Sequence, residues 1–87
     1  MNRKVLKFYA EWCVPCKSLT AKIDQLASTP EIENVDIDAQ RQMTLQYNVR
    51  SVPTMIMVED DGSGWNEVKR VTGSNLSLTE LQIWMNG

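Results

Sequence analysis

Eighty-seven residues are the length of one domain, 43% of them are hydrophobic, and the net charge at pH 7 is −2. This balance indicates neither a nucleic acid nor an anionic membrane as a partner. Because the chain has no histidine, histidine-based acid–base catalysis and histidine metal ligands are excluded. No apolar run approaches the roughly 20 residues of a membrane span, and the N-terminus lacks the features of a signal peptide.

The apolar periodicity predicts an α/β domain over residues 1–87 with the element order βαβαββα. We expect strands over residues 4–10, 33–37, 53–59 and 65–72, and helices over residues 14–28, 39–47 and 78–86. The first two strands should be parallel, because a helix joins them, and the last two should form a hairpin. The result is a four-stranded mixed sheet with helices on both faces.

The only two cysteines, Cys13 and Cys16, follow the first strand, where open α/β sheets place their sites. Thiols at this spacing can close a disulfide within one helical turn, and a helix N-terminus stabilises a thiolate at the first. In the cytoplasm, where we expect this chain, such a pair is redox-active or metal-binding. A closed zinc site needs four ligands, so a metal or iron–sulfur site would require a dimer or carboxylate ligands. Redox chemistry is therefore favoured, with no metal.

The segment Phe8–Lys17, which reads FYAEWCVPCK, resembles the active-site signature of thioredoxins. In the same order as in that family, residues 35–38 resemble the next strand, and residues 47–54 resemble the stretch that carries a cis-proline. Thr72-Gly73 resembles the glycine beside the substrate groove. The resemblance covers the chain from residue 4 onward and implies a thioredoxin-like fold and a protein-disulfide reductase active in electron transport.

The resemblance implies that Cys13 is the nucleophile and that Cys16 resolves the mixed disulfide. Since Cys16 lies on the apolar face of the predicted helix, we expect it to be more buried than Cys13. Pro53 would be the cis-proline, leaving the backbone of Val52 free to pair with an extended substrate. From the residues alone, Pro53 equally fits a trans-proline at the start of a strand.

The resemblance also implies that Trp12, Val52 and Gly73 form an apolar rim around Cys13 that docks protein substrates. Without the resemblance, Trp12 and Val52 fit simple packing, and Gly73 fits a turn. No bound cofactor is expected, and the protein would be a monomer. A separate system would recycle it, either an NADPH-linked thioredoxin reductase or the glutathione pool. Its substrates would be disulfide-containing proteins, with ribonucleotide reductase as one candidate.

Three departures from the thioredoxin pattern concern the N-terminus, the cysteine loop and a buried position. The N-terminal strand and helix of full-length thioredoxins would be missing. Val14 stands where glycine is usual, beside Pro15, and a β-branched residue stiffens the loop. Lys7 occupies the position of a buried aspartate, and Asn34 that of its usual lysine partner. If Lys7 points towards the cysteines, it would favour the Cys13 thiolate and ease reduction of the disulfide.

The alternative for Lys7 is that its ammonium reaches solvent with only the stem buried.

Three other functions remain open from the sequence. The short N-terminus favours a glutaredoxin-like, glutathione-coupled oxidoreductase, although the WCxPCK motif does not. Lys7 and Val14 could make the pair more oxidising. A thioredoxin fold can also serve as a structural binding module of a larger assembly, independently of its cysteines.

Overall fold

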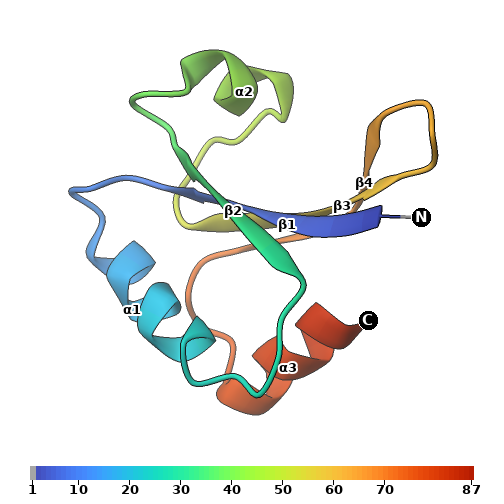
Figure 1. Cartoon of the computed structure of the whole chain (residues 1–87). Coiled ribbons are helices and arrows are strands. Elements are labelled where there is room, and N and C mark those ends of the chain that lie inside the picture. The colour runs from blue at the N-terminus through green and yellow to red at the C-terminus, as the bar shows by residue number, and fades with distance from the viewer. Residues whose placement is uncertain (1) are drawn as a thin grey trace.

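The computed structural model describes residues 2–87 as a four-stranded sheet with helices on both faces (Figure 1). Its elements are β1 (Asn2–Tyr9), α1 (Val14–Ile23), β2 (Glu31–Asp36), α2 (Arg41–Gln46), β3 (Thr54–Asp60), β4 (Trp65–Thr72) and α3 (Leu78–Asn86). The strand order is β2-β1-β3-β4. β1 runs parallel to β2, whereas the β1–β3 and β3–β4 pairs are antiparallel. The predicted βαβαββα order and mixed sheet are confirmed.

The first helix is shorter than the predicted 14–28, because α1 ends at Ile23. Beyond it, the N–H of Gln25 donates to the carbonyl of Lys22, and that of Leu26 to the carbonyl of Ile23. These three-residue spacings form tight turns instead of α-helix. Leu26 still packs against the core, which explains why the apolar spacing extended the prediction. The other boundaries differ by at most two residues, and the last strand and last helix agree.

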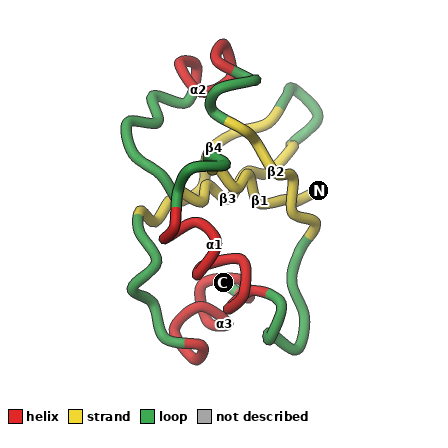
Figure 2. The backbone as a smooth tube through the Cα atoms, turned by 90° about the vertical axis from the view of Figure 1, so that its left-hand side faces the viewer, coloured by secondary structure: helices red, strands yellow, loops and turns green. Residues whose placement is uncertain are grey.

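Alternating side chains of the two central strands divide the core into two layers. On one face of the sheet, α1 and α3 cover a buried cluster of Val5, Leu19, Met55, Met57, Leu81 and Met85. On the other face, α2 and its flanking loops cover a buried cluster of Leu6, Phe8, Val35, Ile56 and Val58. Figure 2 shows this separation, with α1 against α3 on one side and α2 on the opposite side. Each layer therefore depends on β1 and β3.

The two faces are covered to different extents. α2 contributes no buried residue, and that side is completed by partly buried side chains such as Tyr47, whose ring centroid lies 6.0 Å from that of Phe8. α3 begins with a capping box, in which Ser77 and Glu80 satisfy each other's backbone N–H groups. No helix among residues 2–87 is long and apolar enough to cross a membrane.

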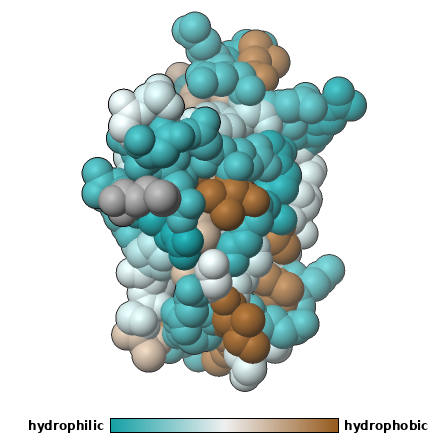
Figure 3. Space-filling view, turned by 90° about the vertical axis from the view of Figure 1, so that its right-hand side faces the viewer, coloured by the Kyte–Doolittle hydropathy of each residue, from teal (hydrophilic) through white to brown (hydrophobic). Residues whose placement is uncertain are grey.

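The side of the molecule that carries the β3–β4 turn is mainly hydrophilic, with small, separate apolar patches (Figure 3). Gly62 and Gly64 lie in this turn at φ values of 99° and 132°, which glycine adopts without strain. Such scattered apolar residues are normal on protein surfaces, so this face gives no indication of a partner.

Replacing Leu81 tests how strongly α3 is attached to the sheet. Leu81 is fully buried, whereas Ile83 on the same helix is 66% exposed. We expect Leu81→Ala to lower the free energy of unfolding by about 2–5 kcal/mol, because it opens a cavity under the sheet. Ile83→Ala should change it by less than about 0.5 kcal/mol. Urea unfolding followed by tryptophan fluorescence measures both, and equal losses would contradict the packing face given for α3.

Candidate active site

The cysteine pair lies where β1 ends and α1 begins. Cys13 is the N-cap residue of α1, and its own N–H donates to the carbonyl of Ala10 over 3.1 Å. The backbone N–H of Cys16 in turn donates to the sulfur of Cys13, also over 3.1 Å. This N–H belongs to the first helical turn, where no backbone acceptor is available. A thiolate at Cys13 would accept the same hydrogen bond more strongly, because its sulfur carries the charge.

Cys13 and Cys16 are joined by a disulfide, with 5.3 Å between their Cα atoms. Both residues are only 4% exposed, so the expectation that Cys16 is the more buried is wrong for the disulfide form. Since Cys13 caps the helix, its side chain folds back over the first turn. There Tyr9, Ile37 and Val52 pack against the buried cluster that the two cysteines form with Ala10.

Trp12 and Val14 flank the disulfide at the surface. They are 67% and 72% exposed, so simple packing does not account for Trp12. The indole N–H of Trp12 donates to the Oδ2 atom of Asp38 over 3.0 Å, which fixes the ring relative to the loop after β2. Asp38 was absent from the predicted site. The hydrogen bond to Asp38 depends on β1 and β2 running parallel, since the carboxyl ends of both strands then lie at the same end of the sheet.

Pro53 and Gly73 lie next to each other, although twenty residues separate them in the chain. The peptide bond between Val52 and Pro53 is cis, as the family resemblance implied, so the trans alternative is wrong. Gly73 has a φ of 93° and donates its N–H to the carbonyl of Pro53 over 2.8 Å. Among residues 2–87, neither backbone polar group of Val52 has a hydrogen-bond partner. Val52 packs against the cluster that contains both cysteines, so an unpaired stretch of backbone lies next to that cluster.

Lys22 attaches the loop after β4 to α1. Its Nζ atom donates to the carbonyls of Ser74 and Leu76, over 2.6 Å and 3.0 Å. This loop contains Gly73, so the helix that begins at the disulfide also holds the loop of the glycine that bonds to Pro53. No local pattern could identify Lys22, because its acceptors are more than 50 residues away in the sequence.

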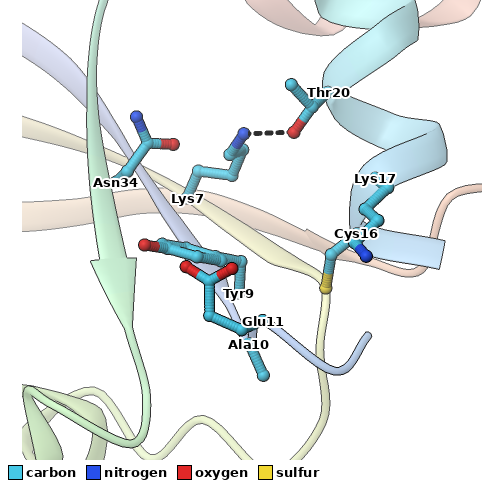
Figure 4. Close-up of a pocket in the computed structure, with 8 residues that line it drawn as sticks. All are labelled: Lys7, Tyr9, Ala10, Glu11, Cys16, Lys17, Thr20 and Asn34. Atoms are coloured by element: carbon cyan, nitrogen blue, oxygen red, sulfur yellow. Dashed lines mark hydrogen bonds between the residues drawn. The ribbon is translucent and has the colours of Figure 1, made fainter. Parts of the chain in front are cut away.

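Lys7 lies inside the protein, in a pocket next to the second cysteine. The residue is 8% exposed, and its Nζ atom donates to Oγ1 of Thr20 over 2.6 Å. Lys7 therefore does not extend into bulk solvent, and its hydrogen-bond partner was absent from the predicted site. The pocket, of about 360 Å³, is lined by Lys7, Tyr9, Ala10, Glu11, Cys16, Lys17, Thr20 and Asn34 (Figure 4). It reaches Cys16 but not Cys13.

The charge of Lys7 is poorly compensated. Burial lowers the pKa of Lys7 below its ordinary value, and attraction to the carboxylate of Asp24 raises it by a smaller amount. No carboxylate among residues 2–87 lies within 4.0 Å of the ammonium. No group of three metal-binding side chains occurs in this part of the chain either, so the metal alternative finds no ligand set there.

Comparison with known proteins gives one consistent result. Residues 1–86 match the thioredoxin family. The chain is 40% identical over 72 residues to thioredoxin of Chlamydia trachomatis, covering 79% of this chain and 67% of that protein. It is 35% identical over 75 residues to Thioredoxin-T of Drosophila melanogaster, covering 82% of this chain but only 45% of that protein. The chain thus spans about half of the length of one of these relatives and two thirds of the length of the other.

A solved structure shows the same likeness in three dimensions. The X-ray structure of Fasciola hepatica thioredoxin superimposes with a TM-score of 0.80 at 30% identity. The superposition covers 98% of this chain and 79% of the Fasciola protein. The similarity therefore extends over the whole sheet and its helices, and is not confined to the segment around the cysteines.

The burial of Lys7 predicts a pH-dependent stability. Because its pKa is lowered in the folded state, unfolding takes up a proton between that pKa and the ordinary value near 10.4, so stability rises with pH there. We expect Lys7→Met to raise the melting temperature of the disulfide form at pH 7, and this gain to shrink towards pH 10. Lys17→Met, at an exposed residue, is the control. A gain from Lys7→Met that stays constant with pH would contradict the prediction.

Proposed function

The chain belongs to the thioredoxin family, and we propose that it reduces disulfide bonds in other proteins through Cys13 and Cys16. Thioredoxins are thiol–disulfide oxidoreductases that bind no cofactor, so the redox group is the Cys13–Cys16 disulfide itself. The proposal rests above all on the position of Cys13 as N-cap of α1, where a backbone N–H already points at its sulfur.

In the reduced protein, the Cys13 thiolate attacks one sulfur of the substrate disulfide. The substrate S–S bond breaks, a mixed disulfide forms, and the departing substrate sulfur takes up a proton. Cys16 then loses its proton and attacks the sulfur of Cys13. The second substrate sulfur leaves as a thiolate, and the Cys13–Cys16 disulfide reforms. Two electrons have passed from the cysteine pair to the substrate.

We propose that substrates dock where Trp12, Val52 and Gly73 surround the disulfide. The exposed ring of Trp12 offers apolar contact. The unpaired backbone of Val52 offers a donor and an acceptor to an extended segment. The hydrogen bond from Gly73 to Pro53 and the contacts of Lys22 fix the position of Gly73 on this surface. Val14 and Pro15 act as modulators through the shape of the cysteine loop.

Membership of the family implies disulfide-containing target proteins and a reductase that recycles the chain. We propose an NADPH-linked thioredoxin reductase for this second role, with the glutathione pool as its alternative, and ribonucleotide reductase as one target. A monomer in the cytoplasm fits these partners. One other function has a specific observation behind it, because Lys7 and Cys16 line the same pocket, which favours a more oxidising variant. The binding module would need only the fold.

Serine variants of the two cysteines test the proposal. With dithiothreitol as electron source, we expect the wild type to accelerate the reduction of insulin, and Cys13→Ser to lower that rate by at least ~10²-fold, because the nucleophile is lost. Cys16→Ser should trap a mixed disulfide between Cys13 and the substrate, visible by mass spectrometry. A wild type without activity would contradict the reductase. If a variant with both Cys13→Ser and Cys16→Ser still binds a partner protein, that result would favour the binding module.

A further inference from the structure

The pocket in Figure 4 joins a buried lysine to the second cysteine of the redox pair. We propose that the ammonium of Lys7 stabilises the Cys16 thiolate of the reduced protein, and thereby sets both the reduction potential of the pair and the rate at which Cys16 resolves the mixed disulfide. The inference rests on the proposed function, because it concerns the same cysteines. Lys7 is then a positioning residue, because its charge acts only through Cys16. Cys13 remains the nucleophile.

The position of Lys7 follows from strand alternation and helix periodicity. Lys7 and Val5 point to the same face of β1, which is the face that α1 covers. There the Nζ atom bonds to Thr20, which lies four residues after Cys16 on α1. Residues at this spacing are neighbours on one face of a helix, with about 5–6 Å between Cβ atoms. Thr20 thus holds the ammonium one helical turn from Cys16.

The remaining charges around the pocket are less suited to this role. Lys17 and Glu11 also line it, but both are exposed and opposite in sign, so water screens them and their effects on Cys16 oppose each other. Asp24 attracts Lys7 but is exposed and forms no ion pair with it. Tyr9, from β1, contributes a phenol to the lining, and Asn34, from β2, contributes an uncharged amide. Among residues 2–87, Lys7 is the only charged residue that is buried.

A buried ammonium acts differently on the two redox states. The disulfide carries no charge, so in that state only the hydrogen bond to Thr20 and the attraction of Asp24 offset the cost of burying the ammonium. Reduction adds two electrons and two protons, and loss of one proton from Cys16 then leaves a thiolate beside the ammonium. This attraction favours the reduced state and raises the reduction potential. It also raises the fraction of Cys16 that is ready to attack the mixed disulfide.

The redox equilibrium with glutathione tests the thermodynamic half of the inference. We expect Lys7→Met to shift the equilibrium towards the disulfide about tenfold, which corresponds to a change in reduction potential of ~30 mV. A shift of this size is expected for the loss of one charge at a high effective dielectric constant. Lys17→Met removes an exposed charge from the same pocket and should shift it less than about twofold. The inference is overturned if Lys7→Met changes the equilibrium less than twofold, or if Lys17→Met matches its effect.

The ionisation of Cys16 tests the second half. In a Cys13→Ser background, thiolate absorbance at 240 nm against pH reports Cys16 alone. We expect Lys7→Met to move this titration to higher pH and Lys7→Arg to restore it, because arginine keeps the charge. Lys7→Gln, which removes the charge but keeps a donor for Thr20, serves as a second neutral variant if the methionine variant does not fold. An unchanged titration in the neutral variants would overturn the inference.

These measurements separate the inference from the proposed function. If the wild type fails to reduce insulin but the Lys7 variants shift the equilibrium and the titration, the function is wrong and the role of Lys7 stands. If the wild type is active and neither quantity shifts, the function stands and Lys7 has only a structural role.

Discussion

β1 is the central constraint of this protein, because it is hydrogen-bonded to β2 on one side and to β3 on the other. Its alternation sends Leu6 and Phe8 into the layer under α2, and Val5 and Lys7 into the layer under α1. Its carboxyl end leads directly to the disulfide. The core and the redox group are thus built on one short strand, so a change in its register would move both at once.

The start of α1 gives the disulfide its chemistry. A helix begins with backbone N–H groups that have no acceptor in the helix. Here the sulfur of Cys13 accepts one of them, from Cys16. The two cysteines consequently differ in surroundings despite equal burial. Cys13 is the helix cap, next to the exposed Trp12, and Cys16 lines the pocket that holds Lys7. This asymmetry matches the two steps of disulfide exchange, in which one sulfur meets the substrate and the other displaces it.

Long-range hydrogen bonds assemble the rest of the site. Gly73 bonds to Pro53, Lys22 bonds to the loop that follows Gly73, and Trp12 bonds to Asp38. Each joins segments that adjacent elements bring to the same end of the sheet. The proposed docking surface is therefore held by the sheet and by α1 together, and the exposed residues around the disulfide need not form a core of their own.

Local spacing and apolar patterns were enough to predict the order of the elements, the start of α1 at the cysteines and the disulfide chemistry. The residues also carried a family resemblance strong enough to imply the cis bond at Pro53. Contacts between elements set the end of α1, the equal burial of Cys13 and Cys16, and the partners of Lys7 and Lys22, so these could not be predicted. Tight turns replace the helix after Ile23 although Leu26 keeps apolar spacing, and burial depends on residues that pack from other elements. A hydrogen bond between Lys7 and Thr20 requires β1 to pack against α1, and no pattern within either segment encodes that contact.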